Sequence, residues 1–165
     1  VPAGAGLLAR GGKAAKAASG VTVKSAAHLG DVAHALEATG RLIKGGLKAS
    51  EKADYIKTVA KASTHNADAT RVLLGSFPEY TKGEGAFFSL PNEVWELVKD
   101  KPDLLWEVNK QFLDDMIGKG KSLVITLGEG RKPGGGLIKE LEYLNKLVEE
   151  GILTYVDGVY IPIPK

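Results

Sequence analysis

The stretch LVITLGEGRKPGGGLIKELEYL, residues 123–144, decides the fold, because it predicts a strand, a glycine-rich loop and a helix in succession. Its first part belongs to KSLVITLG, which is apolar throughout its middle, as is typical of a strand covered on both faces. After the loop, four apolar residues recur along one helical face: Leu137, Leu141, Leu144 and Val148. We therefore expect a central strand, followed by an amphipathic helix that ends at Gly151.

Two short apolar runs before this stretch indicate further strands. They are RVLLG (71–75) and AFFSL (86–90), the second of which is rich in aromatic residues. Two helices are then predicted, one beginning after Pro91 and one after Pro102, since proline is well tolerated at the start of a helix.

The C-terminal residues predict a β-hairpin. Asp157-Gly158 lies between two alternating runs, which is the pattern of a two-residue turn, and the prolines of IPIP (161–164) favour an edge strand. The predicted order from residue 64 onward is β, β, α, α, β, α, β, β. This order indicates an α+β (α/β-like) fold in which a small mixed β-sheet packs with helices.

Charge divides the 165 residues into two parts. Residues 1–63 carry ten Lys and Arg against four Asp and Glu, whereas residues 64–165 carry twelve against sixteen. The Ala/Gly-rich front predicts a basic, helical linker segment over 1–63, and the rest predicts a folded α/β domain over 64–165. Because the second part is acidic, it has no long-range attraction for phosphates, which counts against a plain nucleic-acid-binding protein.

The composition argues against disulfides, thiolate sites, metal sites and membrane-spanning helices. The chain has no cysteine, so it has neither a disulfide nor a thiolate site. Its three histidines do not form a pair on one helix face, and the carboxylates lack the strand-borne pattern of a metal-dependent nuclease, so we expect no bound metal and no cofactor. No apolar run is long enough to span a bilayer, and the first residues lack the pattern of a signal peptide. The first residue is Val, which leads us to expect that the chain comes from a larger protein.

The glycine-rich loop does not match a known nucleotide motif. Three residues separate Gly130 from Gly134, where a dinucleotide fingerprint has two, and no Gly-Lys-Ser/Thr follows as in a P-loop. The loop still joins a strand end, Arg131, Lys132 and a helix N-terminus, and this combination favours an anion. Phosphate binding and a simple connection between strand and helix both remain open.

Two polar residues lie at positions where a site is expected. On a helical wheel Glu140 falls within the apolar arc of the last helix, so its carboxylate is predicted to have a partner, a raised pKa or a catalytic role. Thr126 ends the central strand, where α/β folds collect their ligands. The alternatives are that Glu140 reaches water at the rim of the helix and that Thr126 is only a good strand former.

His65 is the one histidine of residues 64–165, since His28 and His34 lie in the basic front. Cleavage of RNA without a metal needs a base for the 2′-hydroxyl and an acid for the leaving 5′-oxygen, and an imidazole titrates in the right range. Arg71 and Lys82 lie near it in sequence and are candidates for holding a phosphate. A surface histidine without a role is the alternative.

Asn109 and Lys110 flank the apolar stripe of the helix that begins after Pro102. They are candidates for positioning a ligand. Pairing with acidic neighbours one turn away would explain Lys110 equally well.

The chain resembles the C-terminal toxin regions of polymorphic bacterial toxins, in particular those of contact-dependent growth inhibition systems. The resemblance lies in the basic front VPAGAGLLARGGKAAKAAS and in four later runs: TRVLLGSFPEY, AFFSLPNEVW, WEVNKQFLDDMIGKGKSLVIT and GGGLIKELEYLNKLVEEG. It covers most of the chain from about residue 64 onward.

This resemblance implies an antibacterial effector carried at the C-terminus of a large secreted or cell-surface exoprotein. Many such toxins are ribonucleases that cut tRNA in the cytoplasm of the neighbouring bacterium. Each is neutralised by a cognate immunity protein, and some need a host elongation factor. The basic front would then engage an inner-membrane receptor and serve delivery.

Our leading hypothesis is a metal-independent tRNase in which His65 acts on the substrate as acid or base and Glu140 acts as its counterpart. Thr126, Arg71 and Lys82 would hold the scissile phosphate, and Asn109, Lys110 and Arg131 would contact the substrate. Members of the same class also degrade DNA or NAD or form pores. The alternatives are therefore an NAD-consuming or nucleotide-binding toxin that uses the glycine-rich loop, and a membrane-disrupting toxin that acts through its front. The acidic second part fits a ribonuclease if its acidic faces bind protein partners.

Overall fold

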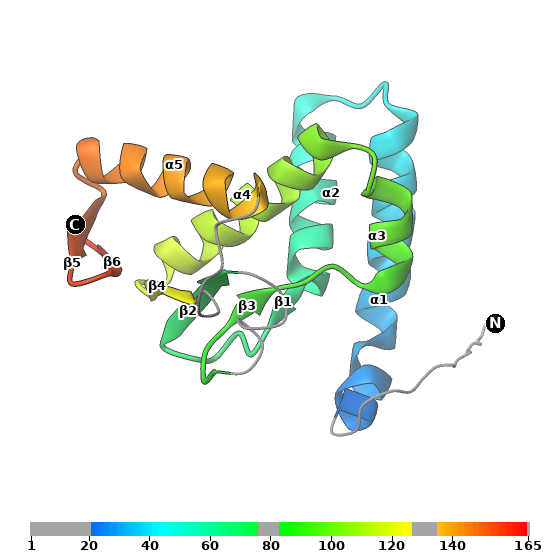
Figure 1. Cartoon of the computed structure of the whole chain (residues 1–165). Coiled ribbons are helices and arrows are strands. Elements are labelled where there is room, and N and C mark those ends of the chain that lie inside the picture. Colours follow the sequence, from blue (N-terminus) through cyan, green and yellow to red (C-terminus); the bar gives the residue numbers. More distant parts are fainter. Residues whose placement is uncertain (1–20, 76–82, 127–134, 165) are drawn as a thin grey trace. The chain divides into compact units, whose positions relative to one another are not determined.

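The structure is a computed structural model, and it describes residues 21–75, 83–126 and 135–164, with side chains from residue 31 onward. The described residues form five helices and six strands in an α+β arrangement, as predicted (Figure 1). The elements are, in order, α1 (Val21–Lys44), α2 (Ala49–Ala62), β1 (Thr64–His65), β2 (Arg71–Gly75), β3 (Phe87–Phe88), α3 (Asn92–Val98), α4 (Pro102–Gly118), β4 (Ser122–Thr126), α5 (Gly135–Glu149), β5 (Leu153–Val156) and β6 (Val159–Pro162).

The chain divides into two compact units, Val1–His34 and Ala35–Lys165. Within the second unit, buried residues from the last part of α1, from α2, from α3 and from α4 form one apolar cluster. The packing of this unit therefore continues across residue 63, where the sequence predicts the boundary between the basic front and the folded domain. That expectation followed the change in charge, which says nothing of the apolar faces of α1 and α2.

The main sheet has four strands in the order β2-β4-β6-β5. β2 and β4 are parallel, with Arg71 opposite Ser122 and Gly75 opposite Thr126, whereas β4–β6 and β6–β5 are antiparallel. The sheet is therefore mixed, and β4 lies inside it, as predicted for KSLVITLG. Leu123 of β4 is buried but Val124 is only half-buried, so the strand is less completely covered than its apolar sequence indicated.

The hairpin is confirmed, but the prediction of an edge strand for IPIP is wrong. Asp157 and Gly158 have positive φ angles of 51° and 83°, which the favoured two-residue hairpin turn requires. β6 lies between β4 and β5, so β5 is the edge strand. Proline is tolerated in β6 because β4 pairs only with Val159 and Tyr160, before Pro162 is reached.

The core on one face of this sheet is built by α4 and α5. Phe112, Leu113 and Met116 of α4 are buried together with Leu137 and Leu144 of α5. The strands contribute Val72, Leu74, Leu123, Leu153 and Tyr160 to the same cluster. Because Leu141 and Val148 pack against this cluster as well, the predicted apolar stripe of the last helix is confirmed.

A second, two-stranded sheet pairs β1 with β3, with His65 opposite Phe87. Of the predicted strand AFFSL, only Phe87 and Phe88 are a strand. Among the helices that the structure describes, none is long and apolar enough to cross a membrane.

Candidate functional site

A polar hollow of about 480 Å³ lies at the amino end of β2. Its lining comes from the turn between β1 and β2 and from the residues before β3: Asn66, Ala69, Thr70, Arg71, Gly83, Glu84 and Gly85. We call it the amino-edge hollow. Because it brings an amide, a hydroxyl, a guanidinium and a carboxylate together, it has the variety of polar groups that a ligand site needs.

Local conformation fixes the walls of the amino-edge hollow. Asn66 has a positive φ of 55°, and its side-chain nitrogen donates to the carbonyl of Gly85 over 3.2 Å. A Cβ atom at Gly85 would lie 2.7 Å from Cγ of Leu73, so only glycine allows this segment to approach β2 so closely. The Ala86 amide then donates to the Arg71 carbonyl over 2.9 Å, which joins the two walls.

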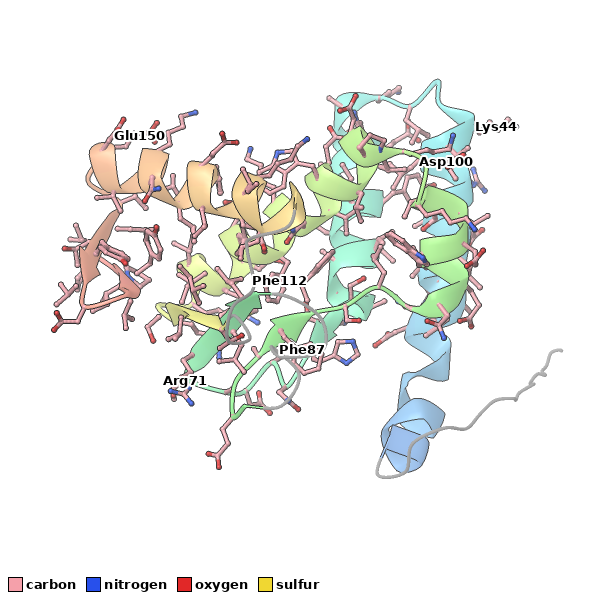
Figure 2. The ribbon with its side chains drawn as sticks, viewed as in Figure 1. Lys44, Arg71, Phe87, Asp100, Phe112 and Glu150 are labelled. Atoms are coloured by element: carbon pink, nitrogen blue, oxygen red, sulfur yellow. The ribbon has the colours of Figure 1, made fainter. Side chains whose placement is uncertain are left out.

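Two cations belong to this edge of the sheet. Nε of Arg71 donates to the carbonyl of Glu84 over 2.8 Å, and the side chain points away from the core (Figure 2). A guanidinium has four further N–H donors on its terminal nitrogens, in a geometry that suits phosphate oxygens. Nζ of Lys121 donates to the carbonyl of Ala69, another lining residue. Arg71 begins β2, and Lys121 directly precedes β4. Because the two strands are parallel and Arg71 is opposite Ser122, both cations lie at the same edge of the sheet.

His65 directly precedes this turn and is held against an aromatic ring. Its imidazole stacks on Phe87, with ring centroids 4.8 Å apart and ring planes only 9° from parallel. Its Nε2 lies 3.1 Å from the carbonyl oxygen of Ser89, and because a carbonyl only accepts hydrogen bonds, Nε2 carries a proton. The half-buried imidazole therefore has a fixed orientation beside the amino-edge hollow's Asn66.

Thr126 lies at the opposite end of the parallel pair of strands. It pairs with Gly75, four residues along β2 from Arg71, which corresponds to about 13 Å of extended chain. Its hydroxyl donates to the carbonyl of Leu74 over 3.0 Å, which is a structural role. Arg71 and Thr126 are thus at opposite edges of the sheet, which does not favour their holding one phosphate together.

Glu140 and Asn109 are brought together between α5 and α4. Glu140 is only 7% exposed, so the prediction that it lies on the apolar side of its helix is confirmed. Burial raises the pKa of Glu140 to about 7, and the side chain of Asn109, which hydrogen-bonds the carboxylate, opposes part of this rise. Oδ1 of Asn109 is buried and has no hydrogen-bond partner among the described residues.

The same two helices carry a more exposed cluster. Nζ of Lys110 lies 5.3 Å from the centre of the Tyr143 ring, and Trp106 meets that ring edge-on at 5.9 Å. The Tyr143 hydroxyl donates to Asp114, and burial together with this carboxylate raises the pKa of Tyr143. Lys110 therefore has an aromatic partner on α5, which accounts for its position without a ligand.

The predicted site residues fall into three places. Arg71 lines the amino-edge hollow, and His65 ends β1, next to the lining residue Asn66. Thr126 ends β4, and Asn109, Lys110 and Glu140 lie on the α4–α5 pair. The contacts described for His65 involve β3 and the residue after it, whereas those of Glu140 involve α4. Lys82 and Arg131 lie outside the described residues, as does the glycine-rich loop.

Four residues of interest were not predicted from sequence: Asn66, Glu84, Phe87 and Lys121. The one local signal was the Asn66-Ala-Asp-Ala-Thr70 turn, whose polar residues separate β1 from β2. Glu84, Phe87 and Lys121 become relevant only through strand pairing.

Within the described residues, no group of three His, Asp or Glu side chains is placed to hold a metal ion. No known protein family, curated protein or solved structure matches this chain.

Proposed function

We propose that this chain is the effector part of an antibacterial toxin that cleaves RNA at the amino-edge hollow without a metal ion. The observation that carries the proposal is the position of Arg71, fixed through Glu84 at the mouth of a polar hollow beside the strand that bears His65. An oriented guanidinium that faces solvent is well suited to bind a phosphodiester. The resemblance to polymorphic toxins favours tRNA as the substrate.

The cleavage step requires two proton transfers. A base removes the proton from the 2′-hydroxyl, the 2′-oxygen attacks phosphorus, and the bond to the 5′-oxygen breaks as an acid supplies its proton. The products are a 2′,3′-cyclic phosphate and a free 5′-hydroxyl. His65 is assigned one transfer and Glu84 the other, while Arg71 and Lys121 stabilise the charge that develops on the phosphate.

We assign the second proton transfer to Glu84 and not to Glu140, the residue that the sequence led us to expect in this role. The Glu140 carboxyl is enclosed between α4 and α5 and hydrogen-bonded to Asn109, so a substrate phosphate would have to separate the two helices to reach it. Glu84, by contrast, lines the amino-edge hollow with Arg71 and is exposed.

The remaining expectations for a toxin of this class belong to the same proposal. The protein would act in the cytoplasm of the target bacterium, be neutralised by a cognate immunity protein and be delivered through its basic front by an inner-membrane receptor. If the purified chain alone cleaves tRNA slowly, we expect a host elongation factor to accelerate the cleavage.

The proposal is tested by incubating the purified chain with total bacterial RNA and EDTA, with and without a lysate that contains elongation factors. We expect tRNA to be cut and the fragments to end in 2′,3′-cyclic phosphate. Intact RNA in both mixtures would contradict the proposal. A fall in NAD, measured in the same lysate while tRNA stays intact, would favour a nucleotide-consuming toxin instead.

A further inference from the structure

Among the described residues, the hairpin β5–β6 leaves one edge of the main sheet and its own outer face exposed. β5 is the last strand in the order β2-β4-β6-β5, and among the described residues it has a strand neighbour only on the β6 side (Figure 1). β5 also lacks the usual protections of an edge strand, because its sequence, Leu-Thr-Tyr-Val, has neither a charge nor a proline.

The register of the hairpin shows which backbone groups point outward. The Ile163 amide donates to the Ile152 carbonyl over 3.0 Å, and Leu153 is opposite Pro162, which has no N–H. Since residues of an antiparallel pair exchange hydrogen bonds at every second position, Ile152, Thr154 and Val156 bond inward to β6. Leu153 and Tyr155 therefore direct their N–H and C=O groups to the open side.

The open face beside this edge is apolar. Successive side chains of a strand point to opposite faces, and the face away from the buried Leu153 and Tyr160 carries Ile152, Val156, Ile161 and Ile163, with the polar Thr154 among them. These four residues, which we call the apolar hairpin face, are 40% to 49% exposed. The row continues inward, because Val156 is opposite Val159 and Val159 is opposite Val124 of β4.

The charged residues near the two ends of β5 indicate which kind of partner can bind at this edge. Glu149 and Glu150 precede the strand and Asp157 follows it, so both ends are acidic, although Lys146 lies 3.9 Å from Glu150. A second copy of the chain that paired antiparallel with β5 would bring the Glu150 end against the partner's Asp157 end. This repulsion disfavours self-pairing, and the same acids disfavour an anionic lipid surface.

We propose that β5 and the apolar hairpin face bind an extended strand of a partner protein, with alternating apolar side chains and Lys or Arg at its ends. The partner strand pairs with the outward backbone groups of Leu153 and Tyr155, its apolar side chains cover the apolar hairpin face, and its basic ends meet Glu149 and Asp157. This inference does not depend on RNA cleavage.

The test uses three synthetic peptides and the full chain. The first is Lys-Val-Thr-Val-Thr-Val-Lys with blocked termini, the second has Glu in place of both Lys, and the third is the first peptide with every backbone amide N-methylated. We expect the first peptide to bind about tenfold more tightly than the acidic one, and the N-methylated one to lose binding, because it cannot pair with a strand.

Variants of the chain locate the binding. Asp157→Asn together with Glu149→Gln should abolish the preference for the basic peptide, and asparagine keeps the positive φ of the turn, whereas Glu93→Gln and Glu96→Gln on α3 should leave the preference unchanged. Equal binding of the methylated and unmethylated peptides to the wild-type chain would overturn the proposal. This comparison needs no variant, so it does not depend on whether a variant folds. A concentration-dependent dimer in which β5 pairs with itself, or binding to anionic vesicles but to none of the peptides, would also overturn it.

Discussion

Replacing His65 by Ala is expected to reduce the rate of RNA cleavage by about 10²–10⁴-fold, which is the range for losing a positioned acid or base. The matched control is His34→Ala, an exposed histidine of α1, which should cleave at the wild-type rate. The measurement is the initial rate at which 2′,3′-cyclic phosphate ends appear, with each variant at the same protein concentration.

Loss of the imidazole also removes its stacking on Phe87, so the folding of the variant has to be checked. His65→Gln separates the two effects, because its side chain has an amide N–H that can reach the carbonyl of Ser89 but cannot exchange a proton near neutral pH. We expect it to be as inactive as His65→Ala but more stable to heat than that variant, because it keeps the hydrogen bond to Ser89 although it loses the stacking on Phe87. A His65→Gln variant that cleaved at the wild-type rate would assign the chemistry to other residues.

The second large effect concerns stability and pH at Glu140. Folding raises the pKa of this carboxyl from its ordinary value of 4.5 to about 7, so the folded chain binds a proton more tightly than the unfolded chain. The stability associated with this proton is complete below about pH 4.5 and is lost as pH rises through about 7. At about 1.4 kcal/mol per tenfold difference in proton affinity, the full loss amounts to about 3 kcal/mol.

Glu140→Gln should abolish this part of the pH dependence. A glutamine amide supplies an N–H donor, which the buried Oδ1 of Asn109 lacks among the described residues, and an oxygen that accepts from the Asn109 amide. The free energy of unfolding of this variant, minus that of the wild type, should therefore rise by about 2–3 kcal/mol between about pH 5 and about pH 8. Urea unfolding at several pH values measures it.

Glu142→Gln is the control, because Glu142 is on the same helix but exposed. Its pH profile of stability should follow that of the wild type. A Glu140→Gln profile parallel to the wild-type profile would show that the carboxyl does not change its proton affinity on folding. The activity of Glu140→Gln is informative as well, since our assignment of Glu84 to the chemistry predicts that RNA cleavage survives this substitution.

Local periodicity was sufficient to predict much of the fold. The spacing of Leu137, Leu141, Leu144 and Val148 predicted both the helix α5 and the burial of Glu140, because a helix turns about 100° per residue whatever surrounds it. The Asp157-Gly158 turn was equally clear, since few residues adopt two consecutive positive φ angles. These features depend on neighbours within one or two turns of chain.

Features that depend on register or on helix packing were not predicted. The prolines of IPIP favoured an edge, but β6 is internal, since it pairs with both β4 and β5. Its proline is tolerated because β4 pairs only with Val159 and Tyr160. The pair of Asn109 and Glu140 depends on how α4 crosses α5, which neither helix encodes alone. β1 and β3 have two residues each, too short for any periodicity, so the stacking of His65 on Phe87 left no trace in the sequence.

The grouping of candidate residues into one site failed for the same reason. We expected Arg71 and Thr126 to hold the same phosphate, Arg71 because it is near His65 in the sequence and Thr126 because it ends the central strand. The parallel register puts Arg71 opposite Ser122 and Thr126 opposite Gly75, so the two residues are at different edges. The same register instead brings Lys121 to the edge that carries Arg71.

The most direct test of the central claim is to locate where RNA binds. A short 2′-O-methyl RNA cannot undergo attack by the 2′-oxygen, so it can be titrated into the ¹⁵N-labelled chain while amide chemical shifts are followed. We predict that the amides of Asn66, Arg71 and Gly85 shift most and that Arg71→Ala abolishes these shifts. Shifts confined to Thr126 and the α4–α5 pair, with the amides around Arg71 unchanged, would contradict the account.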